Sequence, residues 1–209
     1  MVFEFGEETT IPDSYVLADS DAECAELWAS GAPQVVLGGG DLAEVLGSRD
    51  TTALPGTAAI RCLIDVIQIS GRDTSGSIRE FHAVSSCCFG SWWFGEVDVV
   101  TSTGRHDGLE ANPRAHPGDG LLDHLHVVPQ MKLRQRWQCR RKMRTGSHLP
   151  HPDLQVLRST DFDFKGPRKL TVDGIARGQF VSVSCRILPE ALMVIVPLPV
   201  IDIAKSEEV

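Results

Sequence analysis

Three glycines and an aspartate near the start of the chain have the spacing of a phosphate-binding loop. Gly38, Gly39 and Gly40 follow a short apolar run, and Asp41 opens a segment with helical spacing. A glycine loop that leads into a helix suits phosphate, because bare backbone amides converge there with the positive end of the helix. We therefore take these four residues as candidates for binding the phosphates of a cofactor.

A second group of acids could hold a metal ion. Asp119 and Asp123 flank a Gly-Leu-Leu segment, and such a turn offers two carboxylates and a carbonyl oxygen. Hard cations take all-oxygen ligand sets, so we expect Mg²⁺ or Ca²⁺ at this turn. The alternative is that Asp119 forms the turn and Asp123 caps the following strand.

Two of the histidines are candidates for a transition-metal site. His124 and His126 alternate along a predicted strand and therefore share one face, although their spacing fixes no third ligand. His148 and His151 belong to a proline-containing loop. The alternative is that these histidines bond to the backbone at the edge of a domain.

Composition limits the classes of function. The 209 residues are 42% hydrophobic and 23% charged, which is ordinary for a soluble globular protein. Six irregularly spaced cysteines form no C-x-x-C pair, so buried, reduced thiols are expected. No apolar run approaches the roughly 20 residues of a membrane span, and the acidic start is unlike a signal peptide. We expect a cytoplasmic protein, or one peripheral at the membrane, without a nucleic-acid partner.

Acidic and basic residues are segregated along the chain. Residues 1–50 contain eleven acids and one base, Arg49, in a protein of net charge −8. The segment 131–144 contains no acid and seven bases: Lys132, Arg134, Arg136, Arg140, Arg141, Lys142 and Arg144. Clustered cations raise the local potential, so this segment could bind a lipid or membrane surface, or the acidic lobe of a second copy in a homodimer. The alternative is a solvated helix face. The densest aromatic cluster, Trp92-Trp93-Phe94, could line a lipid pocket or pack in the core or an interface.

The first part of the chain has the pattern of a small α/β unit. We predict strands at 15–18 and 34–37 and a helix that starts at a capping box of Ser20 and Glu23 and stops at Gly31 and Pro33. A second helix is predicted at 42–46. This β-α-β-α fragment is too small for a complete nucleotide-binding domain.

Alternation with period two and turn residues dominate from residue 60 onward, which predicts antiparallel strands. The predicted strands are 62–70, 78–86, 96–102, 121–128, 155–164, 169–172, 179–187 and 192–196, with one helix at 131–142. The predicted organisation is an α/β lobe over 1–58, a β-sandwich domain over 59–199 and a loose tail over 200–209.

Three segments together resemble the bacterial diacylglycerol kinase and lipid kinase family. They are His116-Pro-Gly-Asp-Gly-Leu-Leu-Asp123, Arg144-Thr-Gly-Ser-His-Leu-Pro-His-Pro152, and the closing strands from Leu170-Thr-Val-Asp-Gly174 to Ala191-Leu192. Their order and spacing match the family's C-terminal domain over about 95–197. Upstream, Gly39-Gly-Asp41 is similar to the family's phosphate loop with a Gly-Thr pair deleted.

The resemblance implies an α+β, mostly β fold: a diacylglycerol kinase and NAD kinase-like β-sandwich with a small N-terminal α/β remnant. It also implies ATP and Mg²⁺ as cofactors and a carboxylate base for phosphoryl transfer. Ile175 stands where the family has its glutamate base, and Asp173 is the nearest carboxylate, so it is our candidate catalytic residue. We expect a degenerate lipid kinase-like protein that binds a lipid, a nucleotide or a partner. The alternatives are a working lipid kinase completed by oligomerisation and a structural assembly module.

Overall fold

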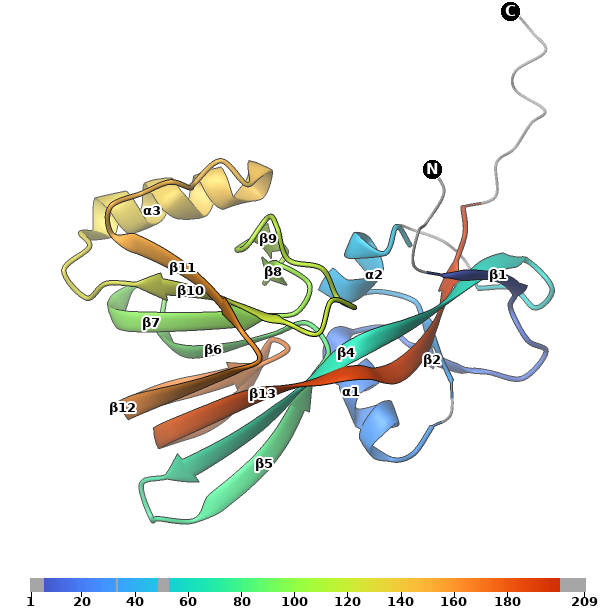
Figure 1. Ribbon diagram of the computed structural model, residues 1–209, viewed down its shortest axis with the longest axis horizontal. Coiled ribbons are helices and arrows are strands. Elements are labelled where there is room, and N and C mark those ends of the chain that lie inside the picture. Colours follow the sequence, from blue (N-terminus) through green and yellow to red (C-terminus); the bar gives the residue numbers. More distant parts are fainter. Residues whose placement is uncertain (1–5, 33, 49–52, 200–209) are drawn as a thin grey trace, which may run out of the picture.

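The computed structural model describes residues 6–32, 34–48 and 53–199 (Figure 1). The predictions for Pro33 and for the tail 200–209 lie outside these residues. The structure has three α-helices, at Asp21–Ala29 (α1), Asp41–Val45 (α2) and Leu133–Lys142 (α3), and a 3-10 turn at Met143–Thr145 (η1) among the described residues. The strands are β1 (Glu7–Thr10), β2 (Val16–Ala18), β3 (Val35–Leu37), β4 (Ala58–Asp73), β5 (Ile78–Ala83), β6 (Ser86–Ser91), β7 (Phe94–Thr101), β8 (Arg105–His106), β9 (Leu109–Glu110), β10 (Leu122–Val127), β11 (Leu154–Ser159), β12 (Asp161–Val172) and β13 (Ile175–Pro197).

The N-terminal β-α-β-α unit forms as predicted. Ser20 caps α1, because its Oγ accepts a hydrogen bond from the backbone amide of Glu23 at 3.2 Å. The Glu23 carboxylate reaches the amide of Asp19 at 2.8 Å rather than that of Ser20, so the predicted capping box is shifted by one residue. β2 and β3 pair in parallel, and all three residues of β3 are buried, as expected for a strand that is covered on both faces.

Most strands belong to one curled sheet. Its order is β1-β4-β13-β12-β6-β7-β10-β11, and β5 adds to β4 while β3 and β2 add to β13. Hydrophobic side chains from β4, β6, β12 and β13, among them Ile67, Phe89, Leu170 and Phe180, form the core that this sheet encloses. The mostly β sandwich-like fold is therefore confirmed.

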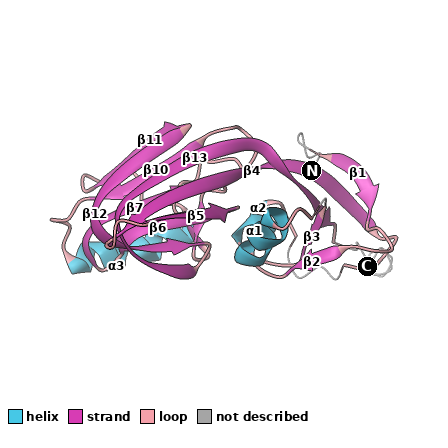
Figure 2. Cartoon of the chain, turned by 90° about the horizontal axis from the view of Figure 1, so that it is seen from below, coloured by secondary structure: helices cyan, strands magenta, loops and turns pink. Residues whose placement is uncertain are grey.

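The two longest strands join the N-terminal unit to the sandwich (Figure 2). β4 and β13 pair antiparallel over most of their length, and the end of β13 also pairs in parallel with β3. The pairing is interrupted between Leu188 and Leu192, where Glu190 has a positive φ of 48°. The sequence pattern predicts two strands here, at 179–187 and 192–196; the structure has one strand with a bulge between them.

Helix α3 and its neighbours form a separate small core. Met131, Cys139 and Met143 pack with Val97, Val99 and other residues of β7 and β10. All six cysteines are free and buried, as predicted. None of the described helices is long and apolar enough to cross a membrane.

Two predictions of strand boundaries are wrong. The predicted strand 155–164 is broken after Ser159, because the chain turns there from β11 into β12. The predicted strand 78–86 ends at Ala83, and Ser86 begins β6 on another path through the sheet.

Candidate functional site

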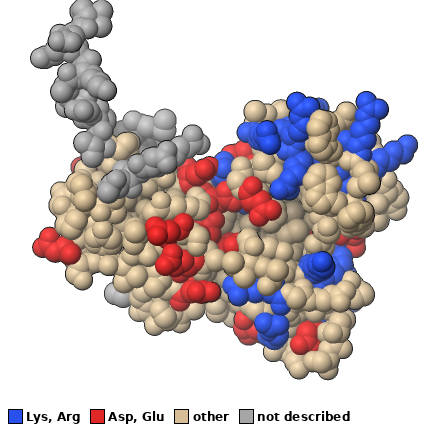
Figure 3. Space-filling model, turned by 180° about the vertical axis from the view of Figure 1, so that it is seen from behind, with Lys and Arg blue, Asp and Glu red and all other residues tan. Residues whose placement is uncertain are grey.

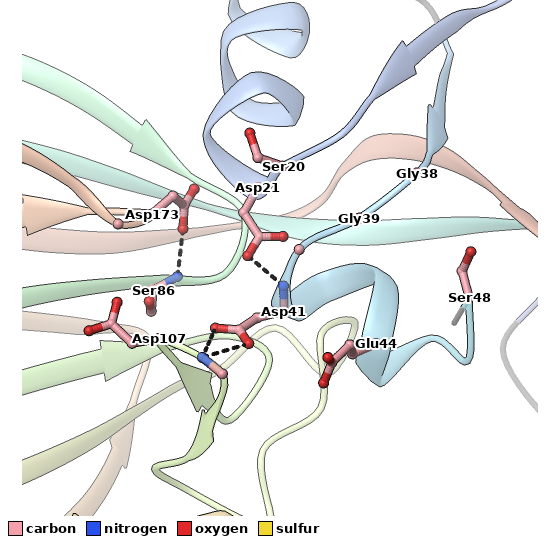
Figure 4. Close-up of a pocket in the computed structure, with 13 residues that line it drawn as sticks. Ser20, Asp21, Gly38, Gly39, Asp41, Glu44, Ser48, Ser86, Asp107 and Asp173 are labelled. Carbon is pink, nitrogen blue, oxygen red and sulfur yellow. Dashed lines mark hydrogen bonds between the residues drawn. The ribbon is translucent and has the colours of Figure 1, made fainter. Parts of the chain in front are cut away.

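A pocket of about 610 Å³ lies where the N-terminal unit meets the sandwich (Figure 4). Its walls come from the segment after β3, the turn between β12 and β13, and the turn between β8 and β9. It is lined by Ser20, Asp21, Gly38, Gly39, Gly40, Asp41, Glu44, Ser48, Ser86, Asp107, Gly108, Asp173 and Gly174. The structure therefore brings the predicted phosphate loop and the predicted catalytic Asp173 to one site.

The pocket is strongly acidic. Five of its lining residues carry carboxylates, namely Asp21, Asp41, Glu44, Asp107 and Asp173, and none of the described lining residues is Lys, Arg or His. Figure 3 shows acidic side chains gathered across the middle of one face of the molecule.

A carboxylate from the chain itself sits at the start of α2. The buried Asp21 accepts the backbone N–H of Asp41 on Oδ2 at 2.8 Å and the N–H of Leu42 on Oδ1 at 3.1 Å. Burial raises the pKa of Asp21 to about 6, although these two hydrogen bonds oppose the rise. Of the predicted phosphate-binding residues, Asp41 thus already has its amide paired with an internal anion, and Gly38 donates its amide to the carbonyl of Ala18 at 2.8 Å.

The three glycines have a packing role in this arrangement. A Cβ atom on Gly38 would lie 2.6 Å from Oδ1 of Asp19, and one on Gly39 would lie 2.6 Å from the carbonyl oxygen of Asp19. A Cβ on Gly40 would lie 2.3 Å from Oδ1 of Asp21, and Gly40 also has a φ of +98°. The loop needs glycine in order to approach residues 19–21 this closely.

Asp41 ties α2 to the β8–β9 hairpin. Its Oδ1 accepts hydrogen bonds from Nε of Arg105 and from the backbone N–H of Gly108, both at 3.1 Å. The same guanidinium also pairs with Glu44 and, at 2.7 Å, with Glu110. Arg105 therefore neutralises acids next to the pocket, and it does so from outside the pocket lining.

Asp173 holds a backbone segment. It lies in the turn between β12 and β13 with a φ of 43°, and its carboxylate accepts the amides of Val84, Ser85 and Ser86 at 2.9, 3.1 and 2.8 Å. Burial, and next the charge of Asp21, raise the pKa of Asp173 to about 7. Ile175 follows it on the surface.

The predicted metal ligands Asp119 and Asp123 lie together, away from this pocket. Both carboxylates pair with the guanidinium of Arg158, and the distance between Oδ1 of Asp123 and Nε of Arg158 is 3.1 Å. Asp119 Oδ1 also accepts the amide of Leu121 at 3.0 Å, which is the turn-forming role of the alternative prediction. A hard cation at this turn would have to displace Arg158.

The basic segment forms one end of the molecule (Figure 3). Six of the seven predicted bases face solvent or line surface grooves, but Arg136 is 1% exposed. Its guanidinium donates to four backbone carbonyls, those of Met131, Trp92, Gly95 and Val128. The prediction that Arg136 belongs to the surface is therefore wrong, because the helix turns this position toward β7.

Aromatic side chains interleave with these exposed cations. A groove of about 410 Å³ is lined by Trp93, Asp107, Leu109, Trp137, Arg140, Arg141 and Arg144. The Arg141 guanidinium stacks over the Trp137 ring at 4.8 Å, and Phe94 is 71% exposed at the start of β7. The Trp-Trp-Phe cluster is thus split, since Trp92 is buried and donates from Nε1 to the Arg136 carbonyl. We call Trp93, Phe94, Trp137 and the six exposed bases the basic-aromatic surface.

The loop histidines bond to the backbone. His148 Nε2 lies 3.0 Å from the carbonyl oxygen of Ala111, and His151 Nδ1 accepts the amide of Asp153 at 3.1 Å. Their contacts match the alternative to metal binding.

Sequence reasoning missed several residues of the pocket region, among them Asp21, Arg105, Asp107 and Gly108. Asp21 gives no local signal, because its partners lie twenty residues away. Asp107-Gly108 had a usable signal, since an Asp-Gly pair between short runs is typical of a hairpin turn. Predicting this hairpin would also have placed Arg105, which lies on the strand before the turn, close to it.

Comparisons with known proteins agree with this architecture. The model of the YegS C-terminal NAD kinase beta sandwich-like domain matches residues 94–196. Two solved structures from Bacillus anthracis str. Sterne, one described as a candidate diacylglycerol kinase and one as a diacylglycerol kinase, superpose with TM-scores of 0.53 and 0.51. Both are 11% identical in sequence, and the alignments cover 83% and 84% of this chain and 80% of each solved chain. No curated protein matches the sequence.

The fold is thus that of the diacylglycerol kinase and NAD kinase-like lipid kinases. Within it, residues 94–196 are a YegS-type C-terminal domain, which confirms the predicted resemblance.

Proposed function

We propose that this chain is a diacylglycerol kinase-like protein that has lost phosphoryl transfer and acts by binding anionic lipid surfaces. The observation that carries the proposal is the Asp21 carboxylate at the N-terminus of α2. A nucleotide phosphate at this loop would need the same amides, and Asp21 already accepts them.

The charge of the pocket also disfavours a nucleotide. A phosphate charge 4 Å from one carboxylate is repelled by about 4 kcal/mol at an effective dielectric constant of about 20. Five carboxylates line the pocket, and the nearest cation, Arg105, already pairs with two of them, Asp41 and Glu44, from outside the lining. ATP therefore fits the residues of this pocket poorly, and we route no chemical step through it.

The position of the general base supports the same conclusion. Ile175 has no titratable group, and the Asp173 carboxylate already accepts hydrogen bonds from three backbone amides. A missing general base alone lowers a rate by about 10²- to 10⁴-fold.

The basic-aromatic surface suits an anionic membrane. Lysine and arginine near such a surface contribute about 1 kcal/mol each, and tryptophan and phenylalanine favour the interface between headgroups and acyl chains. Here the exposed Trp93 and Trp137 share a groove with Arg140, Arg141 and Arg144. Asp107 lines both this groove and the pocket, and its carboxylate lies 3.8 Å from Nη2 of Arg140. Basic side chains gather at this end of the molecule, which can therefore approach the membrane (Figure 3).

Vesicle binding tests the lipid half of the proposal. We expect the protein to sediment with phosphatidylserine-containing vesicles and not with pure phosphatidylcholine vesicles, and to be released by salt. Replacing Arg140, Arg141 and Arg144 by alanine should weaken binding by about 100-fold, from about 1 kcal/mol per charge. The matched control replaces three exposed cations of β12 and β13, Lys165, Lys169 and Arg186, and should bind as the native protein does.

Thermal unfolding with ATP and Mg²⁺ tests whether the protein binds nucleotide, which phosphoryl transfer requires. A ligand at about 100 times its Kd raises the unfolding free energy by about 2.7 kcal/mol, whereas we expect no shift here. Transfer of labelled phosphate from ATP to diacylglycerol in vesicles would contradict the proposal.

Size exclusion identifies the competing assembly module. If the basic-aromatic surface docks on the acidic N-terminal unit of a second copy, a dimer will form at low salt and dissolve at high salt. Such a dimer, with no binding to anionic vesicles, would overturn the lipid proposal.

A further inference from the structure

A cluster of two histidines and one aspartate lies apart from the pocket and the basic-aromatic surface. Asp98 is on β7, and His124 and His126 are on β10, which pairs antiparallel with β7 and places His126 directly opposite Asp98. Because side chains alternate along a strand, all three project from the same face of the sheet. Asp98 is the third member that the spacing of the histidines could not supply.

The three side chains converge on one point. Oδ1 of Asp98 lies 2.8 Å from Nε2 of His124 and 2.8 Å from Nδ1 of His126. One nitrogen from each ring and one carboxylate oxygen all fall within 4.8 Å of one another. We infer that Asp98, His124 and His126 bind one divalent transition-metal ion of the Zn²⁺, Co²⁺ or Fe²⁺ type. Two imidazoles and a carboxylate are the donors these ions prefer, and they leave further positions for water or a ligand.

The surroundings hold each donor in place. The His124 ring packs against Phe162 and Phe164, with centroids 4.9 and 5.0 Å away. Its Nδ1 is buried and has no hydrogen-bond partner among the described residues, so Nε2 is the nitrogen that faces a polar group. The two phenylalanine rings restrict the rotation of the His124 ring.

Arg168 fixes the carboxylate from the other side. Its Nη1 donates to Oδ2 of Asp98 at 2.7 Å, which leaves Oδ1 directed at the histidines. The Asp98 carboxylate, held by the Arg168 guanidinium on one side, can neutralise part of the charge of a metal ion on the other.

The cluster is reachable from solvent. The side chains of Asp98 and His124 are 4% and 7% exposed, whereas that of His126 is 19% exposed. Glu96 lies beside it at the surface, with Oε1 3.8 Å from Nε2 of His126. A metal ion can enter past His126, and Glu96 supplies a further carboxylate at the rim.

Titration of the purified, metal-free full chain with Co²⁺ and Zn²⁺ tests the inference. We expect one Co²⁺ per chain, with visible absorption from nitrogen and oxygen ligands, without thiolate-to-cobalt charge transfer, and displaced by Zn²⁺ but not by Mg²⁺. His126→Gln, at the most exposed ligand, should weaken binding by about tenfold or more while the metal-free protein keeps its fold by circular dichroism. His151→Gln, a partly exposed histidine beside Asp153, is the control and should bind as the native protein does.

Two results would contradict metal binding by this cluster. A cluster that serves only as a hydrogen-bonded network will give no saturable Co²⁺ spectrum, and this outcome overturns the inference. Equal Co²⁺ binding by the native protein, His126→Gln and a folded His124→Gln variant overturns it as well. Neither result bears on the lipid proposal, which depends on a different surface.

Discussion

Asp21 caps helix α2, which begins at Asp41, because the Asp21 carboxylate accepts a hydrogen bond from the backbone amide of Asp41 at 2.8 Å. In a nucleotide-binding loop, an external phosphate makes this kind of contact. Here the anion belongs to the protein, so the loop is complete without a ligand. This contact, together with those of Gly40, Arg136 and Arg158, leads to four expected outcomes for stability and ion binding.

We expect the buried Asp21 carboxyl group to stabilise the folded state more strongly as the solution is made mildly acidic. Because the pKa of Asp21 is about 6 in the folded chain against an ordinary 3.8, the folded state holds this proton more tightly than the unfolded state. The contribution is fully present below about pH 4 and is lost as the pH rises through about 6, with an upper limit of about 3 kcal/mol. Asp173, with a pKa of about 7, acts in the same direction.

Urea unfolding at a series of pH values measures this effect. Asp21→Asn should flatten the profile, and Asp13→Asn, at an exposed site, should leave it unchanged. Parallel profiles for the native protein and Asp21→Asn would contradict the assignment, since Asp21 would then have the same pKa in the folded and unfolded states.

Gly40→Ala should destabilise the protein more than Gly56→Ala does. Both glycines have a positive φ, of +98° and +78°, but Gly40 also has a ψ of 174°, a backbone region that almost only glycine adopts. A methyl group at position 40 would in addition lie 2.3 Å from Oδ1 of Asp21, whereas nothing lies within 4 Å of one at position 56. The difference in unfolding free energy between the two variants measures the backbone strain and the contact with Asp21 together, and equal losses would contradict both.

Arg136→Met should cost about 3 kcal/mol or more of unfolding free energy. The substitution leaves four buried carbonyl groups without the guanidinium that donates to them, and charged hydrogen bonds of this kind contribute about 1.5–3 kcal/mol each. Arg134→Met, at an exposed position on the same helix, should change stability by about 0.5 kcal/mol or less. Chemical denaturation of the two variants makes the comparison.

Removing Arg158 should expose the predicted cation site. With Arg158 in place, its guanidinium occupies the space beside Asp119 and Asp123, so we expect no stabilisation of the native protein by Mg²⁺ or Ca²⁺. Arg158→Ala should gain stabilisation by Ca²⁺ in thermal unfolding, because two adjacent carboxylates are then unpaired. Stabilisation of the native protein at equal Ca²⁺ would show instead that the cation displaces the arginine.

Local sequence signals predicted much of the fold. The Ser20 cap and the buried strand predicted at 34–37 depend on neighbouring residues, and the structure confirms both, with the strand at Val35–Leu37. The boundary at Thr160 was missed because no glycine or proline marks it in the sequence. A long-range contact marks the break, since the amide of Ile187 donates to the Thr160 carbonyl.

The chemistry of the sites was less accessible. Nothing in the sequence near Asp21 indicates that it will cap a helix at residue 41, and nothing near Asp98 indicates His124 or Arg168. Arg136 looks like its neighbours in a run of bases, and only the packing of α3 on β7 buries it. Pairings across strands and helices decide these roles, and they require the tertiary structure.

The bulge in β13 limits how the molecule can move. The Trp28 indole donates to the Ala191 carbonyl at 2.9 Å, and Asp65 accepts the amides of Glu190 and Gly120 at 2.9 and 2.8 Å. A hinge at this point would break all three bonds and bend two strands that pair on both sides of it. We therefore expect hydrogen exchange to report the α/β unit and the sandwich as one cooperative body, with the same protection on both sides of Glu190.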